Sequence, residues 1–121
     1  MAKDMARLST HVLDTSQGIP AAGVVVHLHL VRGDLRVSVA TATTNADGRT
    51  DAPLLSGDRL DTGVYELTFH VGDYFRSAGA ILTNPPFLDV VVVRIGVADA
   101  AGSYHVPLLV SPYGYSTYRG S

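Results

Sequence analysis

The groups that could perform chemistry in this sequence are its histidines, arginines and hydroxyls, because the chain contains no cysteine. There are five histidines, at His11, His27, His29, His70 and His105. Imidazole is the side chain that changes its charge near neutral pH without any perturbation, so a histidine can accept or donate a proton there. The lack of cysteine excludes thiol nucleophiles, disulfides and zinc–thiolate sites.

His27 and His29 stand two residues apart in "VVVHLHLV", the spacing that places two imidazoles on one face of a strand. Two imidazoles so placed can converge on a metal ion. The sequence assigns no third ligand, however, and histidines on a half-polar sheet face are usually structural or exposed. We therefore predict no metal site and no cofactor.

His11 and His105 each interrupt a strand pattern that Val or Ile would satisfy, near opposite ends of the chain. On the residues alone, a buried histidine bonded to a neighbour is the favoured interpretation of both. Arg49 follows the turn signal Asp47-Gly48 and by itself indicates an exposed, solvated arginine. The sequence contains no nucleophile elbow and no glycine-rich phosphate loop before a helix, which argues against a serine hydrolase or a nucleotide-binding protein.

The elements that must position these residues are short β-strands. Runs rich in Val, Ile, Leu, Thr and Tyr alternate with period two and are separated by Gly, Asp, Asn and Pro clusters, as in an all-β sandwich. We predict seven or eight strands in two packed antiparallel sheets. One short helix is expected near Asp73, which could cap it, and Gly79 should close it. Pro107 predicts an edge position or a bulge in the last apolar strand.

Length and charge limit the partners. A chain of 121 residues is expected to form one domain, spanning 1–121, with a sizeable core. The net charge of −2 gives no basic field for nucleic acid. No apolar run has the length of a signal peptide or a membrane span, so we expect a cytoplasmic protein with no membrane partner.

Three stretches of the sequence, taken together, resemble a known family. They are "LSTHVLDTSQGIPAAGV" near the start, "TNADGRTDAPLL" in the middle and "YHVPLLVSPYGYSTYRGS" at the end. The family is 5-hydroxyisourate hydrolase, the transthyretin-related enzymes of urate breakdown, and the terminal "YRGS" separates the enzymes from the hormone carriers. One departure is Ser103, where many members carry a further histidine. Because that position lies outside the motif histidines, we expect little consequence from it.

The resemblance implies a fold, an assembly and a site. The fold would be a transthyretin-like sandwich of two four-stranded antiparallel sheets with one short helix. The assembly would be a homotetramer with active sites at the dimer–dimer interface. Carried over by motif, the site would contain His11, Arg49, His105, Tyr118, Arg119, Gly120 and Ser121. The tyrosine-rich tail would then be packed because it forms a wall of the substrate pocket.

The implied reaction is hydrolysis of 5-hydroxyisourate to 2-oxo-4-hydroxy-4-carboxy-5-ureidoimidazoline by water attack on a ring carbonyl. His11 and His105 would act as the general-base pair, and Arg49 would hold the oxygens of the substrate and the developing negative charge. Tyr118 and Ser121 would be pocket groups. Which histidine takes the proton, and whether the hydroxyl or a terminal carboxylate of Ser121 matters, stays open.

Two other classes of function are compatible with the same strands. One is a non-catalytic small-molecule carrier of the transthyretin type, which would have no need for His11, Arg49 and His105 together. The other is a structural β-sandwich module, of the kind that occurs as a repeat in longer exported proteins.

Overall fold

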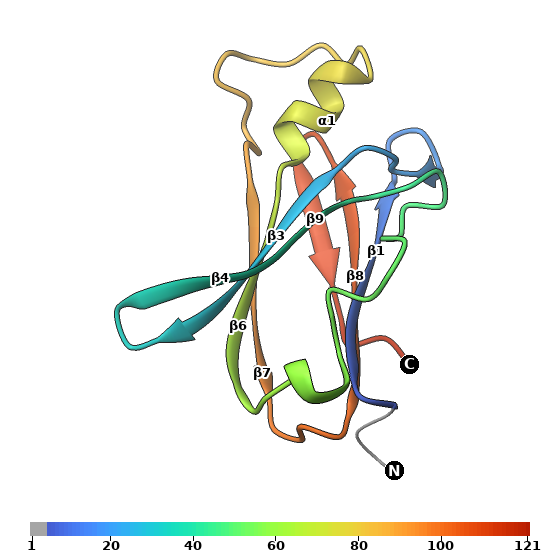
Figure 1. The fold of residues 1–121 in the computed structure, drawn as a ribbon. Coiled ribbons are helices and arrows are strands. Elements are labelled where there is room, and N and C mark those ends of the chain that lie inside the picture. Colours follow the sequence, from blue (N-terminus) through green and yellow to red (C-terminus); the bar gives the residue numbers. More distant parts are fainter. Residues whose placement is uncertain (1–4) are drawn as a thin grey trace.

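The chain folds into two β-sheets that pack face to face, with one short α-helix at one end (Figure 1). The computed structural model describes residues 5–121. The strands are β1 (Arg7–Asp14), β2 (Ile19–Pro20), β3 (Val25–Arg32), β4 (Leu35–Thr43), β5 (Leu55–Ser56), β6 (Gly63–Phe69), β7 (Val91–Val97), β8 (Ser103–Ser111) and β9 (Gly114–Thr117). The helices are the 3-10 turn η2 (Gly57–Arg59) and α1 (Val71–Ser77). The predicted all-β sandwich with one short α-helix is confirmed.

One sheet has the order β4-β3-β6-β7, and the other has the order β2-β1-β8-β9. The second sheet has five strands where four were predicted, because β5 also pairs with β1. Both β2 and β5 contain only two residues, and they pair with opposite ends of β1. The segment between β4 and β5 runs along the edge of β1, where Arg49 forms a backbone bridge with His11.

Period-two alternation explains which face of each strand is buried. In β1 the side chains of Leu8, Thr10 and Val12 are buried, while Ser9 and His11 are half-buried on the opposite, outer face. The inner faces of β3, β6 and β8 supply much of the rest of the core, including the fully buried side chains of Leu28, Phe69 and Leu108, and β7 and α1 add to it. The outer face of the five-stranded sheet carries Ser9 and His11 on β1 and His105 on β8.

Two strand predictions are wrong. The sheets are not wholly antiparallel, because β1 and β8 pair in parallel. These strands come from opposite ends of the chain, so no hairpin fixes their direction. Pro107 is neither at an edge nor at a bulge, since β8 lies between β1 and β9. Its missing N–H falls where the β8–β9 ladder is interrupted, and the ladder resumes in the same register with His105 opposite Gly120.

The helix α1 begins earlier than its sequence signal suggested. Asp73 lies inside the first turn and pairs with Arg76 at 3.1 Å, and the N-cap position belongs to His70. Gly79 follows the helix with a φ of 84°, as expected of a residue that closes a helix. Tyr74 of α1 donates a hydrogen bond of 2.8 Å to the buried carboxylate of Asp14, which ties the helix to the end of β1. Among residues 5–121 no helix has the length and apolarity needed to cross a membrane.

Candidate active site

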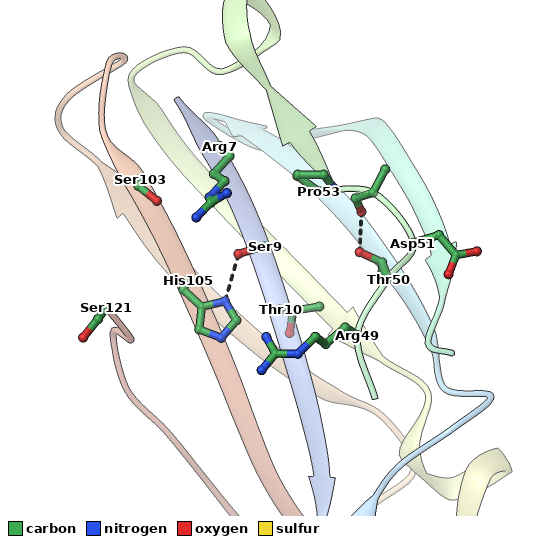
Figure 2. Close-up of a pocket in the computed structure, with 11 residues that line it drawn as sticks. Arg7, Ser9, Thr10, Arg49, Thr50, Asp51, Pro53, Ser103, His105 and Ser121 are labelled. Carbon is green, nitrogen blue, oxygen red and sulfur yellow. Dashed lines mark hydrogen bonds between the residues drawn. The ribbon is translucent and has the colours of Figure 1, made fainter. Parts of the chain in front are cut away.

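A pocket of about 260 Å³ opens on the outer face of the five-stranded sheet, between β1, β8, the segment 49–53 and the end of the chain (Figure 2). Three of the residues proposed from the sequence line it: Arg49, His105 and Ser121. The other lining residues are Arg7, Ser9, Thr10, Thr50, Asp51, Ala52, Pro53 and Ser103. The structure therefore brings together groups that are far apart in the sequence.

The parallel pairing of β1 with β8 places His105 in the pocket. The register sets Ser9 directly opposite His105, and the Ser9 hydroxyl lies 2.8 Å from Nδ1 of the ring. Figure 2 shows the other ring nitrogen directed away from Ser9, toward the side of the pocket where Arg49 lies. The nitrogen that faces the pocket is thus Nε2.

A tight turn positions Arg49 beside β1. The Asn45 side-chain oxygen accepts hydrogen bonds from the backbone N–H groups of Asp47 and Arg49. Gly48 has a φ of 76°, and its carbonyl accepts a hydrogen bond from Val12. A Cβ atom at Gly48 would collide with the Val12 carbonyl oxygen, so only glycine allows this close approach. The turn predicted at Asp47-Gly48 is confirmed, and it fixes the point on the backbone from which the exposed Arg49 side chain extends.

His11 lies beside the pocket rather than in its lining. It is on the same outer face of β1 as Ser9 and forms a backbone bridge with Arg49. Its Nε2 lies 2.8 Å from the carbonyl oxygen of Asp47. A carbonyl can only accept, so Nε2 of His11 carries a proton and donates it. His11 therefore braces the turn that carries Arg49.

His105 is held in its neutral form. Burial lowers its pKa below the usual value, and the neighbouring Arg49, His11 and Arg7 lower it further. Among residues 5–121, neither Arg7 nor Arg49 forms an ion pair with a carboxylate. The pocket thus combines this imidazole with the Asp51 carboxylate and with two guanidinium groups that pair with no carboxylate of residues 5–121, and such guanidinium groups suit a planar, oxygen-rich substrate.

The residues of the tail, 118–121, lie in different surroundings. Gly120 lies against the His105 ring, and its N–H donates to the His105 carbonyl at 2.8 Å. Tyr118 and Arg119 do not line this pocket; they line a neighbouring cavity of about 340 Å³, which His105 also lines, together with Ile95, Gly96, Tyr104, Val106 and Thr117. The Arg119 guanidinium lies over the Tyr104 ring, 4.3 Å from its centre. Of the tail side chains, only that of Ser121 reaches the pocket.

Sequence reasoning missed five polar residues of the pocket lining, Arg7, Ser9, Thr10, Thr50 and Asp51. Arg7 and Ser9 share the outer face of β1 with His11, so the period of two carried a signal for them. Ser103 was expected to have little consequence, yet it lines the pocket beside Arg7. Its place follows from the β1–β8 register, which the sequence did not reveal.

His27 and His29 lie far from this pocket, on the four-stranded sheet. Their ring centres are 4.4 Å apart, and Nε2 of His27 is 2.9 Å from the Ser38 hydroxyl. Within the described part of the chain, no three histidine, aspartate or glutamate side chains gather closely enough to hold a metal ion.

Comparisons with known proteins identify the family of this chain. The model of the HIUase/Transthyretin family matches residues 8–120. A protein of Rhizobium meliloti (strain 1021) named 5-hydroxyisourate hydrolase 2 is 59% identical over 115 residues, which are 95% of this chain and 96% of the relative. The chain belongs to the HIUase/Transthyretin family.

Solved structures show the same fold. The structure of Klebsiella pneumoniae 5-hydroxyisourate hydrolase superposes with a TM-score of 0.78 at 38% identity, covering 97% of this chain and 100% of that chain. A crystal structure of (S)-allantoin synthase superposes with a TM-score of 0.91 at 43% identity. That match covers 98% of this chain, which spans only 45% of the allantoin synthase chain.

Proposed function

We propose that this protein is an enzyme that hydrolyses 5-hydroxyisourate in urate breakdown, and that residues 1–121 form its single catalytic domain. The family match and the 59% identity to a relative named for this activity support the substrate. The observation that carries the chemistry is the convergence of His105, Arg49 and Ser121 on one pocket.

The neutral His105 ring is suited to act as the general base. Its Nε2 takes a proton from a water molecule, and the water oxygen attacks a ring carbonyl carbon of the substrate. The carbonyl oxygen becomes negatively charged in the tetrahedral intermediate, and the Arg49 guanidinium stabilises that charge. The intermediate collapses when the carbon–nitrogen bond of the ring breaks, and the proton passes from His105 to the leaving nitrogen. The new carboxylate belongs to 2-oxo-4-hydroxy-4-carboxy-5-ureidoimidazoline.

The remaining groups shape this reaction. His11 supplies the second imidazole at the rim of the pocket; because its Nε2–H donates to the Asp47 carbonyl, His105 takes the proton in this mechanism and His11 holds the turn that carries Arg49. Ser121 contributes a hydrogen-bonding group on the opposite wall. Because the residues present are sufficient for proton transfer and charge stabilisation, we propose a mechanism without a metal or other cofactor.

A direct test generates 5-hydroxyisourate in place with urate oxidase and follows its decay by absorbance and circular dichroism. We expect the protein to accelerate the decay and to give one enantiomer of the product. The H105A variant, at the same concentration, is the control and should leave the decay at its spontaneous rate. Decay at the spontaneous rate with the wild-type protein would contradict the proposed function and favour a carrier.

We also propose a homotetramer with its sites at the dimer–dimer interface. Aromatic exposure supports association: the rings of Phe87 and Tyr113 stack with their centres 5.9 Å apart, yet these residues are 70% and 61% exposed. The edge strands β7 and β9 also leave backbone groups available for pairing. Light scattering coupled to size-exclusion chromatography tests this assembly; the mass of one chain, 12.8 kDa, would contradict it.

The cytoplasm is the proposed location, because a chain without cysteine suits a reducing compartment. Cell fractionation followed by the decay assay checks it. Activity confined to a membrane or secreted fraction would contradict it.

A further inference from the structure

The pocket contains a hydroxyl that the proposed mechanism does not use. Ser9 is half-buried on the outer face of β1, and its Oγ lies 2.8 Å from Nδ1 of His105. The two residues are direct partners in the parallel ladder of β1 and β8. Both strands are inside the sheet and paired on both sides. The contact is therefore set by the backbone register and not by a mobile loop.

The far side of the His105 ring is confined by Gly120. A Cβ atom at Gly120 would lie 2.7 Å from Cδ2 of His105 and 3.3 Å from Cγ of Pro107, so the terminal segment passes directly against the imidazole. This contact restricts where the ring can be, but an imidazole rotated by 180° about its Cβ–Cγ bond has nearly the same shape. In the rotated ring Cε1 replaces Nε2, so the pocket would face a carbon that cannot accept a proton. Only a hydrogen bond can distinguish the two orientations.

The charges around the pocket indicate which ring nitrogen carries the proton. His105 is neutral near pH 7, because burial and the nearby positive charges lower its pKa. Figure 2 shows Nε2 on the side of Arg49, where a lone pair is attracted to the guanidinium and an N–H is repelled by it. A neutral imidazole with its lone pair on Nε2 has its proton on Nδ1. The Ser9 hydroxyl oxygen then accepts that N–H.

We propose that Ser9 is a positioning residue for His105. It accepts the Nδ1–H of the ring, which selects the ring orientation and the tautomer that present a bare Nε2 to the pocket. This inference rests on the proposed function for its catalytic consequence. The tautomer itself is a property of the resting protein and can be measured without substrate.

The test uses S9A and S9T in the full chain. S9A removes the acceptor, and S9T restores a hydroxyl at the same branch point with a side chain that suits a strand. We expect S9A to lower kcat by about tenfold to a hundredfold with little change in KM, because the ring loses its productive orientation and not its contact with substrate. S9T should recover most of kcat.

The matched control is S38A. Ser38 makes the same kind of contact with His27, at 2.9 Å, on the other sheet. Removing it should leave kcat at the wild-type value, because that histidine lies on the other sheet and does not line the pocket of His105. Thermal unfolding of all three variants should stay within a few degrees of the wild type, since each change replaces a hydroxyl or adds a methyl group at a half-buried or exposed position.

Nitrogen-15 chemical shifts of the imidazoles provide the second measurement. The wild-type protein should show His105 with its proton on Nδ1, and S9A should shift the signals toward the other tautomer. Unchanged kcat and unchanged shifts in S9A would overturn the role of Ser9, while the proposed function would stand on the wild-type activity. A wild-type protein that does not accelerate substrate decay would contradict the function, while the shifts would still test the hydrogen bond.

Discussion

Each of the two sheets carries a pair of histidines on its outer face, but the surroundings of the two pairs differ. On the four-stranded sheet, His27 and His29 come from one strand and lie against each other, with a serine bonded to His27. On the five-stranded sheet, His11 and His105 come from different strands beside a pocket. His105 therefore has a pocket beside its ring, whereas the rings of His27 and His29 lie against each other.

Charge separates the two faces further. On the four-stranded sheet the Glu66 carboxylate accepts from both Arg36 and Arg94, at 2.8 and 3.0 Å. Hydrogen bonds from these arginines hold the pKa of Glu66 below its usual value. On the five-stranded sheet, by contrast, Arg7 and Arg49 find no carboxylate partner within residues 5–121. A face whose charges are already satisfied is structural, and a face with unsatisfied cations around a pocket can bind a polar ligand.

The largest expected effect comes from replacing one histidine on each sheet with alanine and comparing the two variants. We expect H105A to reduce kcat/KM by about two to four decades, because it removes the general base. H27A should leave kcat/KM unchanged, although both changes remove a half-buried imidazole bonded to a serine. Urate oxidase-coupled decay of 5-hydroxyisourate measures both. Equal losses in the two variants would end the distinction between the faces.

Two glycines near the end of the chain offer the next contrast. In G120A the new methyl group would overlap the His105 ring, whereas a Cβ atom at Gly114 would meet only the Ser111 hydroxyl, at 3.8 Å. Because the ring must move, we expect G120A to lower kcat by about tenfold and G114A to leave it unchanged. Steady-state kinetics measures the effect, and thermal unfolding checks that both variants fold. Wild-type kcat in G120A would show that the terminal segment does not confine His105.

The sequence predicted the elements of this fold better than their contacts. Alternation identified the short strands, because burial of one face is a local property of a strand. The parallel register of β1 and β8 joins opposite ends of the chain, and no local pattern encodes it. Ser9, which the register places opposite His105, was therefore missed.

The tail shows the same limit. The resemblance grouped its last four residues as one wall of the pocket. Arg119 instead packs on the Tyr104 ring and donates to the Ser103 carbonyl oxygen, so its guanidinium is held outside the pocket. A motif names the residues of a site but does not say which way each one points.

A smaller effect should appear in the pH dependence of the active face. Burial lowers the pKa of His105, and Arg49, His11 and Arg7 lower it further. The neutral base therefore persists to lower pH than in an ordinary histidine, and kcat/KM should fall on the acid side only below that ordinary value. R7Q removes one positive charge, so the pKa of His105 should rise and the acid limb should move to higher pH.

The matched control for R7Q is R76Q. It makes the same change in net charge on α1, where Arg76 pairs with Asp73. The profile of R76Q should coincide with that of the wild type. A shift of the acid limb to lower pH in R7Q would contradict the assignment of that limb to His105.

The smallest expected effect tests the structural face by itself. E66Q weakens the two charge-assisted bonds to Arg36 and Arg94, so the melting temperature should fall slightly while kcat/KM stays unchanged. The pKa of Glu66 is lowered in the folded protein, so its carboxylate stabilises the fold above the unfolded pKa. That contribution is lost as the pH falls through the folded pKa. The difference in melting temperature between E66Q and the wild type should therefore be present at neutral pH and vanish in acid.

D73N is the matched control for E66Q, because Asp73 is 72% exposed and its single ion pair is screened by water. Its melting temperature should match that of the wild type at every pH. The comparison between the faces becomes sharper if E66Q changes stability alone while R7Q changes the pH profile alone. A loss of activity in E66Q at full stability would mean that the paired charges of the four-stranded sheet act on the reaction, and the separation of the two faces would fail.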